Sequence, residues 1–273
     1  MRAKPGSKTR ADGVSKASSK SASNGLWLYG VHPVKAALRF GSKYIESLCL
    51  AEQLGERQRD EMTSLAKQSQ VNIQWVDRSW FDQRFPDIPH QKVAALYQQP
   101  PAKDMAWLQA QLRKPDSSEE SAKHSLILVL DGVQDPQNFG ACLRVAESLG
   151  VLAIVQSKTG QASLTAAAHK AAAGAAVLVP IVEVTNLARA LRELKDAGCW
   201  IYGAAGETEL SLTDIDFATS SVVVMGAEGQ GLRANTREHC DQVFAIPMYG
   251  ETESLNVSVA TGIVLHTIRT QWG

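Results

Sequence analysis

Three short loops carry the side chains that could bind a polar ligand or move a proton. The first contains Asn138 and Arg144, the second contains Glu228 within a run of glycines, and the third contains Ser254 and Asn256. Amides and hydroxyls donate and accept hydrogen bonds, a carboxylate accepts them, and a guanidinium keeps its positive charge at physiological pH. These loops form one site only if the fold brings them together.

The second loop, Met225–Arg233, is rich in glycine. Glycine adopts positive φ angles and lets a ligand approach the backbone closely, so Gly226, Gly229 and Gly231 favour a binding loop. The spacing is neither the G-x-G-x-x-G of dinucleotide-binding proteins nor a Walker A sequence, which excludes NAD-binding and phosphate-binding loops of those kinds. A glycine-rich loop alone does not identify the ligand.

The third loop follows a strand, Val243–Ile246, that should end at Pro247 because proline has no N–H for a sheet ladder. Ser254 and Asn256 are both residue types that cap helices, and we expect a helix from Val257 to about Arg269. Its first turns are small or apolar, which predicts burial on most sides. Gly262 weakens a helix and therefore suggests close backbone packing.

Apolar strands alternate with helices from Leu126 to the C-terminus. We expect strands at Leu126–Leu130, Val151–Val155, Val177–Val182, Trp200–Gly203, Ser221–Met225 and Val243–Ile246. We expect helices between them at Asn138–Leu149, Ser163–Ala176, Asn186–Ala197 and Leu232–Cys240, the first capped by Asn138. This alternation is typical of an α/β fold with a mainly parallel sheet covered on both faces. Ligands in such folds bind beyond the carboxyl ends of the strands, where the three loops lie.

Three other regions precede this part of the chain. Residues 26–98 read as a small α/β domain, and residues 99–123 as a linker, rich in Pro, Ser and charge, with a short helix around Met105–Leu112. Residues 1–25 hold six basic residues and one acidic residue and too few apolar ones to fold alone, so we expect a disordered tail. Such a tail could hold phosphates loosely or serve only to solubilise the chain.

Composition narrows the class of protein. The 273 residues carry 28 basic and 28 acidic side chains, and 44% of them are hydrophobic, as in soluble globular proteins. No apolar run is long enough to span a bilayer, and the N-terminus has no secretory h-region, so we expect a cytoplasmic protein. The four cysteines lack C-x-x-C spacing, and we expect reduced thiols and no metal site.

Taken in order, the three loops resemble the motifs of the SpoU (TrmH) family of RNA 2'-O-ribose methyltransferases, which belongs to the SPOUT class. These motifs are Asn-x-Gly with a following arginine, Gly-x-Glu-x-x-Gly, and Ser-Leu-Asn after Ile-Pro-Met. The resemblance covers about residues 26–271. Residues 26–98 resemble the family's substrate-binding domain, which has a ribosomal-protein-like fold. Two residues depart from the family pattern: Lys92 replaces a usual glycine, and Val177 replaces a frequent acidic residue.

The resemblance implies a deep trefoil knot in residues 124–273, a pocket for S-adenosylmethionine lined by Gly226, Ile246 and Leu255, and a homodimer through this domain. The substrate it implies is RNA, and the most similar subgroup methylates a guanosine of 23S rRNA. Two alternatives stay open: a family member acting on tRNA, and a catalytically silent RNA-binding protein of ribosome assembly.

The family's site residues carry over to Arg144, Glu228 and Asn256 as catalytic residues, and to Asn138 and Ser254 as substrate-binding ones. Arg144 is either the base, as proposed for the family, or a group that grips phosphate and polarises the hydroxyl, because arginine stays protonated. Glu228 then orients Arg144 or accepts the proton itself. We expect guanosine to be selected by the RNA fold and the N-terminal domain.

Overall fold

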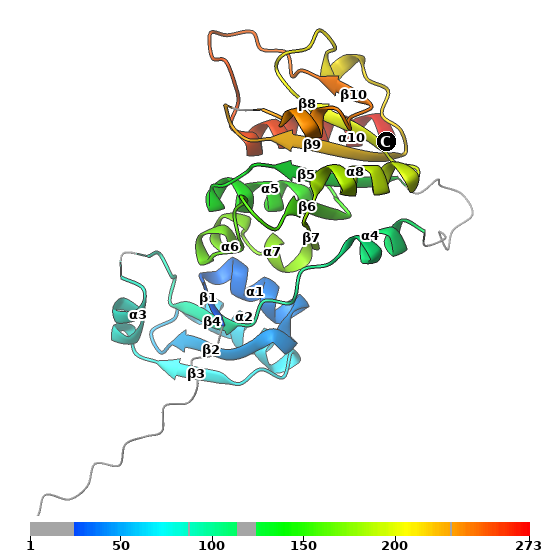
Figure 1. Ribbon diagram of the computed structural model, residues 1–273. Coiled ribbons are helices and arrows are strands. Elements are labelled where there is room, and N and C mark those ends of the chain that lie inside the picture. Colours follow the sequence, from blue (N-terminus) through cyan, green and yellow to red (C-terminus); the bar gives the residue numbers. More distant parts are fainter. Residues whose placement is uncertain (1–24, 87, 114–123, 230) are drawn as a thin grey trace, which may run out of the picture.

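A computed structural model describes residues 25–86, 88–113, 124–229 and 231–273 (Figure 1). Residues 1–24 of the predicted disordered tail and residues 114–123 of the predicted linker lie outside these ranges. The described chain forms two α/β units, each built on its own sheet.

The N-terminal unit is a four-stranded sheet in the order β1-β4-β2-β3. Its strands are β1 (Leu26–Tyr29), β2 (Ile45–Ala51), β3 (Ile73–Val76) and β4 (Val93–Tyr97), and its helices are α1 (Val31–Phe40), η1 (Ser42–Tyr44), α2 (Glu56–Gln68) and α3 (Arg78–Arg84). Side chains of α1 and α2 pack on one face of the sheet, and those of α3 pack on the other. This part of the chain therefore has helices on both faces of a mixed sheet.

The C-terminal unit is a six-stranded sheet in the order β10-β8-β9-β5-β6-β7, in which every pair of neighbours is parallel. Its strands are β5 (Ser125–Asp131), β6 (Ala153–Ser157), β7 (Ile181–Val184), β8 (Trp200–Ala204), β9 (Ser220–Gly226) and β10 (Gln242–Phe244). Its helices are α5 (Pro136–Ser148), α6 (Ala166–Ala172), α7 (Ala175–Leu178), α8 (Leu187–Asp196), η2 (Leu212–Asp214), α9 (Ala234–Arg237) and α10 (Val257–Trp272). The predicted parallel α/β architecture is confirmed.

Both faces of the large sheet are covered, which explains why its strands are almost uniformly apolar. Side chains of α5, α6, α7 and α10 form the larger core on one face. Side chains of α8 form a second core on the other face, together with α4 (Met105–Leu112). The helix expected within the linker is thus present, and its Leu108 is fully buried against the large sheet. The C-terminal unit therefore recruits part of the predicted linker into its core.

Two predictions about the region before β7 are wrong. The predicted helix 163–176 is broken, because Ala173 (φ 50°) and Gly174 (φ 107°) adopt left-handed backbone conformations that end α6. Residues 177–178, expected in a strand, belong to the short helix α7, and β7 begins at Ile181. The break lets the chain turn where it meets the N-terminal unit, a long-range contact that local patterns do not report.

The two units touch along α1 and the α6–α7 break. A Cβ atom added at Gly174 would lie 2.7 Å from the Ala36 Cβ, so only glycine permits this approach. Val177 packs against the core of the N-terminal sheet, and its Cγ1 lies 3.1 Å from the position of a Cβ at Gly41. The apolar departure at Val177 thus serves a contact between the units, where an acidic side chain would lose hydration.

Lys92, the other departure, occupies a strained turn before β4. Gln91 (φ 52°) and Lys92 (φ 62°) are both left-handed, a conformation that glycine adopts without steric cost. The Gln91 side chain nevertheless contributes, because its Oε1 accepts a hydrogen bond from the Val31 N–H at 3.0 Å. The Lys92 side chain contributes an exposed contact from Nζ to the Gln53 carbonyl, at 3.2 Å, and the hydrogen bond of its backbone N–H to the His90 Nδ1, at 3.0 Å, does not depend on the side chain.

Replacing Lys92 with glycine should therefore stabilise the protein. We expect the free energy of unfolding to rise by about 0.5–1 kcal/mol, because relief of left-handed strain exceeds the added freedom of the unfolded chain. The matched variant Gln91→Gly relieves similar strain but deprives Val31 of its acceptor, and it should be less stable than Lys92→Gly. Urea unfolding of both variants measures the difference. A lower stability for Lys92→Gly than for the wild type would contradict this account.

Helix α10 is only partly buried. Val264, Leu265 and Ile268 are fully buried, whereas Val259 is 51% exposed and Ile263 is 38% exposed. The prediction that this helix is buried on most sides is therefore wrong for a single chain. The expected close packing at Gly262 also fails, because a Cβ there would meet only the Val145 Cγ1, at an ordinary 3.8 Å. None of the helices in the described ranges has the length and apolar character to cross a membrane.

All four cysteines are free thiols, as expected. Burial raises the pKa of Cys142, Cys199 and Cys240 to about 11. These thiols are therefore uncharged at neutral pH, and they are poor nucleophiles.

Candidate active site

The parallel sheet brings the three loops to one edge. Asp131, the last residue of β5, pairs in register with Gly226, the last residue of β9. The loop that follows β10 reaches the same edge and leads into α10. The three loops, which are far apart in the sequence, thus meet at the carboxyl ends of their strands. The sequence predicts a ligand site at this place.

The first loop ends at an N-capped helix, but the cap is not the predicted residue. The Asp135 carboxylate accepts hydrogen bonds from the Gln137 N–H at 3.1 Å and the Asn138 N–H at 3.3 Å, so α5 begins at Pro136. Proline is well suited to this first helical position, where the N–H has no partner. The prediction that Asn138 caps the helix is therefore wrong. The shift leaves the Asn138 amide in the first turn, free to contact the other loops.

The second loop is closed by its own backbone. The Gly231 N–H donates to the Ala227 carbonyl at 2.9 Å, and Gly229 and Gly231 both have positive φ angles. A Cβ atom at Gly226 would lie 2.2 Å from the Gly231 carbonyl carbon, a contact that no side chain can make. The close approach expected of a ligand at Gly226 is thus made by the loop itself, and Glu228 is held at the tip of a tight turn.

The third loop ends at Asn256, which is the one of the two predicted capping types, Ser254 and Asn256, that caps α10. Its Oδ1 accepts hydrogen bonds from the Ser258 N–H at 3.0 Å and the Ser258 hydroxyl at 2.6 Å. With Oδ1 committed to the helix end, the Asn256 Nδ2 must point away from α10. The cap therefore aims an amide donor at the first and second loops.

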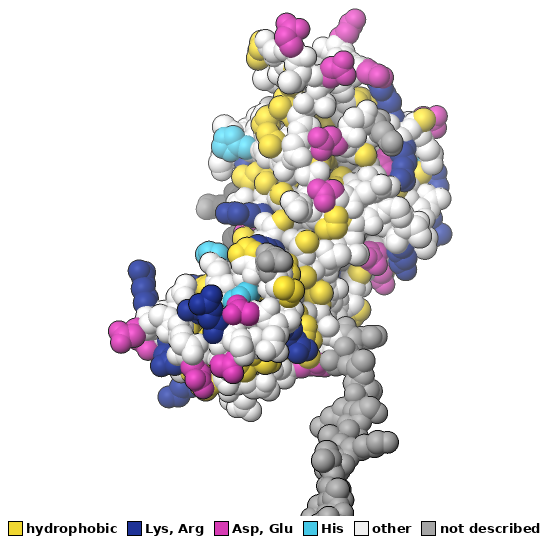
Figure 2. Space-filling model, turned by 90° about the vertical axis from the view of Figure 1, so that its left-hand side faces the viewer, with side chains coloured by type: hydrophobic (Ala, Val, Ile, Leu, Met, Phe, Trp, Pro, Cys, Tyr) yellow, Lys and Arg dark blue, Asp and Glu magenta, His cyan; other side chains and the backbone are white. Residues whose placement is uncertain are grey.

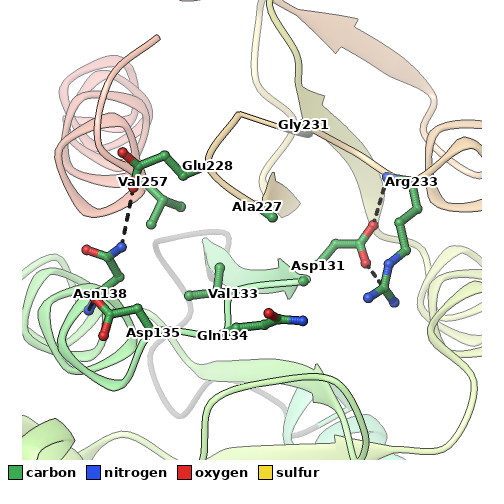
Figure 3. Close-up of a pocket in the computed structure, with 11 residues that line it drawn as sticks. Asp131, Val133, Gln134, Asp135, Asn138, Ala227, Glu228, Gly231, Arg233 and Val257 are labelled. Carbon is green, nitrogen blue, oxygen red and sulfur yellow. Dashed lines mark hydrogen bonds and ion pairs between the residues drawn. The ribbon is translucent and has the colours of Figure 1, made fainter.

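Asn138, Glu228 and Asn256 meet in one hydrogen-bonded cluster. The Asn256 Nδ2 donates to the Asn138 Oδ1 at 2.8 Å and lies 3.4 Å from the Glu228 Oε2. The Asn138 Nδ2 also donates to the Glu228 Oε2, at 3.4 Å (Figure 3). Two amide donors thus converge on one carboxylate oxygen. Such an arrangement fixes the orientation of the carboxylate.

Two cavities adjoin at this cluster. The first encloses about 430 Å³ and is lined by polar side chains of the β5 and β9 loops, including Asn138. The second encloses about 400 Å³ and lies between the loops that follow β8, β9 and β10. Four residues line both cavities: Ala227, Glu228, Gly231 and Val257. A group bound in one cavity can therefore approach a group bound in the other beside the Glu228 carboxylate.

Most of the predicted site residues lie around these cavities. Gly226, Ile246 and Leu255 all line the second cavity, and Ser254 lies with them rather than with Asn138. Arg144 stands apart: it is exposed on α5 and lines neither cavity. Its guanidinium makes no hydrogen bond or ion pair with any other described residue.

Several lining residues escaped the sequence analysis. Asp131 and Arg233 line the first cavity, and Glu207, Arg237 and Glu253 line the second. The sequence position of Asp131 could have indicated a functional role, because it is a charged residue at the end of a wholly apolar strand. The others look like ordinary surface residues in sequence, because what places them is the folding of three distant loops onto one another.

Comparisons with known proteins agree with this geometry. The family model described as "SpoU rRNA Methylase family" matches residues 125–266. A second model, described as "RNA 2'-O ribose methyltransferase substrate binding", matches residues 27–102. The two matched segments coincide with the two sheets.

Curated relatives match along most of the chain. The chain is 42% identical over 238 residues to "23S rRNA (guanosine-2'-O-)-methyltransferase RlmB" of Pseudomonas syringae pv. tomato, covering 87% of this chain and 92% of the relative. It is 43% identical over 243 residues to the protein of the same name from Pasteurella multocida, covering 88% and 96%.

Solved structures share the fold. The SpoU methyltransferase AviRb from Streptomyces viridochromogenes, in complex with the cofactor AdoMet, aligns with a TM-score of 0.73 at 20% identity, covering 92% of this chain and 94% of that one. A putative RNA methyltransferase of the TrmH family from Porphyromonas gingivalis aligns with a TM-score of 0.69 at 24% identity, covering 90% of each chain. By its matched segments and its curated relatives, the chain belongs to the SpoU rRNA methylase family.

Proposed function

We propose that the protein transfers a methyl group from S-adenosylmethionine to the ribose 2'-hydroxyl of a guanosine in 23S rRNA. The observation that carries this proposal is the position of Glu228 on the shared wall of two adjoining cavities. One cavity can hold the methyl donor and the other the target nucleoside, so the two reactants meet beside a carboxylate. The curated relatives supply the substrate class.

The second cavity suits S-adenosylmethionine in size and chemistry. Ile246, Leu255 and Leu232 give apolar walls for the adenine, and Gly226 lines the same cavity. Glu207 and Glu253 add carboxylates that complement a cofactor bearing a sulfonium and an ammonium group. We assign Ser254 to this cavity as well. When bound, the cofactor supplies an electrophilic methyl group.

The polar cluster is assigned to the nucleophile. A neutral ribose hydroxyl is a weak nucleophile, and its attack requires alignment with the methyl group and removal of its proton. Asn138 and Asn256 both donate to the Glu228 Oε2, which leaves the other oxygen, Oε1, without a hydrogen bond to any described residue. Oε1 is thus available to accept the hydroxyl proton. Glu228 is assigned as the base and the two asparagines as the groups that position it.

Arg144 is assigned to the RNA backbone. Its exposed guanidinium lies on α5 outside both cavities, where it can grip a phosphate beside the target nucleotide. The family's alternative, Arg144 as the base, requires this exposed side chain to reach the hydroxyl when RNA binds, and the kinetics of Arg144 variants distinguish the two roles.

Transfer of labelled methyl groups tests the proposal. The protein, labelled S-adenosylmethionine and 23S rRNA from a strain lacking the gene should give a labelled 2'-O-methylguanosine at one site, mapped by resistance of the adjacent bond to alkali. Labelling of tRNA in place of 23S rRNA would favour the first alternative. Failure to bind S-adenosylmethionine in calorimetry would favour a silent assembly protein.

We also propose the domain boundaries and chain path that the family resemblance implies. Residues 26–98 form an RNA-binding domain, 99–123 a linker, and 124–273 the catalytic domain of a cytoplasmic enzyme. The chain leaves β10 at the edge of the sheet, passes the β8 and β9 loops beside the second cavity, and returns to pack α10 on α5 near the centre. This return supports a deep trefoil knot.

An aromatic cluster on the N-terminal unit is a candidate RNA contact. The exposed Arg84 guanidinium lies 4.7 Å from the ring centre of Trp27 and 5.3 Å from that of Trp80, and both indoles are partly exposed. Unstacked RNA bases bind to aromatic and guanidinium planes of this kind. Figure 2 shows basic and acidic side chains interspersed on the visible face, so charge alone does not mark the RNA path there.

The exposed stripe on α10 supports the proposed homodimer. Val259 and Ile263 are one turn apart and exposed, so they form an apolar stripe that a second copy of the chain can cover. Gly262 lies between them and lets a partner helix approach closely, which accounts for a glycine that has no packing role within one chain.

Ile263→Asp should convert the dimer to a monomer, because it places a charge in the centre of this apolar contact. The side chain is already exposed in one chain, so folding should be unaffected. Thr63→Asp, an exposed change on α2, is the matched control and should remain dimeric. Sedimentation at micromolar concentration distinguishes the two states. A dimeric Ile263→Asp variant, or a wild type or isolated 126–273 domain that is monomeric, would contradict the proposed interface.

A further inference from the structure

The first cavity has two polar ends. At one end lie Asn138 and Glu228, and across the cavity from them lies Arg233, drawn together with Asp131 (Figure 3). The small apolar side chains of Val133 and Ala227 lie between the two ends. Arg233 is the cationic residue among those that line this cavity. The polar cluster at the first end is already assigned to the ribose hydroxyl, whereas the second end has no assignment.

Arg233 is held in place by a buried carboxylate. The Asp131 Oδ2 accepts a hydrogen bond from the Arg233 backbone N–H at 3.1 Å, and its Oδ1 forms an ion pair with the Arg233 Nη1 at 3.5 Å. Asp131 is 1% exposed, and its Oδ1 has no hydrogen-bond partner among the described residues. A buried carboxylate in this situation depends on the neighbouring cation for its stability. Asp131 therefore fixes both the backbone and the guanidinium of Arg233.

The guanidinium remains available to a ligand. The Arg233 side chain is 56% exposed, and it has five N–H donors of which Asp131 faces only one edge. Its Nη2 lies 3.7 Å from the position of a Cβ at Gly132 and 3.8 Å from that at Gly160, so the guanidinium lies beside these two glycines. The fold thus holds the planar Arg233 guanidinium in a fixed orientation at the rim of the first cavity, with N–H donors available to a ligand.

We propose that Arg233 reads the base of the target nucleoside by donating to O6 and N7 of guanine. This proposal rests on the proposed function. With the 2'-hydroxyl at Glu228, the base extends across the cavity toward Arg233, over Val133 and Ala227. The 3'-phosphate lies next to the reacting hydroxyl, at the Glu228 end, whereas the base projects from the other side of the ribose. A guanidinium pairs bidentately with the two acceptors of guanine, whereas adenine presents an N6 donor in place of O6.

Base analogues at the mapped acceptor position provide the test. The probe is a 23S rRNA fragment carrying guanosine, 7-deazaguanosine or inosine there, and the readout is the single-turnover rate of methyl transfer at saturating RNA. For the wild type, 7-deazaguanosine should react about tenfold more slowly, because it lacks the N7 acceptor. Inosine retains N7 and O6 and should react about as fast as guanosine.

Arg233→Gln should abolish the difference between guanosine and 7-deazaguanosine to within about twofold, because the residue that senses N7 is gone. Arg233→Lys keeps the charge but loses the planar fork, so it should retain RNA affinity and lose part of the discrimination. Arg189→Gln, an exposed arginine paired with Glu193 on α8, is the control and should behave as the wild type. Undiminished sensitivity of Arg233→Gln to 7-deazaguanosine, with a lower rate on every base, assigns Arg233 to phosphate and overturns the proposal.

The wild-type reaction on guanosine separates this inference from the proposed function. Without methyl transfer to the unmodified fragment, the proposed function fails before any analogue is compared. Transfer to the fragment with equal rates on guanosine and 7-deazaguanosine leaves the function intact and refutes the reading of N7. Asp131→Asn offers a second measurement. It keeps an acceptor for the Arg233 N–H but removes the ion pair, and it should reduce discrimination without eliminating transfer.

Discussion

Glu228→Gln should lower the single-turnover rate of methyl transfer by about 10²–10⁴-fold, the range expected for loss of a general base. Glutamine has the same shape as glutamate but cannot accept the hydroxyl proton. It also places an amide where two donors, the Asn138 and Asn256 Nδ2 groups, converge on a carboxylate oxygen. The measurement is transfer of labelled methyl to the mapped 23S rRNA fragment with enzyme in excess.

The matched control is Glu253→Gln, because Glu253 lines the second cavity but not the first. At saturating S-adenosylmethionine this control should keep the wild-type rate, and only its cofactor affinity should change. Cofactor binding by Glu228→Gln, followed by calorimetry, should stay close to that of the wild type. A rate for Glu228→Gln within tenfold of the wild type would remove Glu228 as the base.

Asn138→Ala and Asn256→Ala separate positioning from proton transfer. Each change removes one of the amide donors that hold the Glu228 Oε2 and leaves the base in place. Both variants should therefore be slower than the wild type and faster than Glu228→Gln. The Asn256 variant should also lose helix stability, since its Oδ1 caps α10.

The parallel sheet, and the edge of the sheet where the three loops lie together, could both be predicted from the sequence. Both follow from the local pattern of apolar strands that alternate with helices. Buried parallel strands are uniformly apolar, as β5 and β9 show, and their carboxyl ends meet at one edge once the order is parallel. The cap at Asn256 was predictable for the same reason, since a side chain two residues from its partner N–H needs no tertiary information.

The remaining features depend on contacts between distant segments. Asp131 and Arg233 are 102 residues apart in sequence. The local sequence around either residue does not predict its contact with the other. The break between α6 and α7 falls at Gly174, which packs against α1 of the N-terminal unit, whereas the alanines on either side of it favour helix. The helix cap at Asp135 was missed because Asn138 is an equally good capping type, and local sequence alone does not decide between them.

The first sequence motif correctly placed Arg144 on helix α5, but it did not decide whether Arg144 acts as the base or contacts phosphate. Arg144 follows Asn138 by six residues, so the two side chains are about 120° apart around α5. Asn138 consequently faces Glu228, whereas Arg144 projects from an exposed face of α5. This divergence favours contact with the RNA backbone over contact with Glu228, and it makes a clear kinetic prediction.

Arg144→Ala should lose most methyl transfer, by about 10²-fold or more, while cofactor binding survives, because Arg144 lines neither cavity. Arg144→Lys is the informative variant, since lysine keeps the charge, loses the planar fork and deprotonates more readily when buried. If Arg144 grips phosphate and polarises the hydroxyl, the lysine variant should keep part of the rate, with the wild-type dependence on pH. If Arg144 is the base, that variant should follow a new and lower ionisation.

The assay for both variants is single-turnover transfer across pH, with RNA binding measured separately so that lost affinity is not mistaken for lost chemistry. Salt supplies a further readout, because removal of a phosphate contact reduces the salt dependence of RNA binding by about one unit of slope. Arg144→Ala should therefore bind RNA with a shallower salt dependence, which Glu228→Gln should not share. Full activity in Arg144→Ala would exclude both roles for the arginine and leave Glu228 to act with the two asparagines alone.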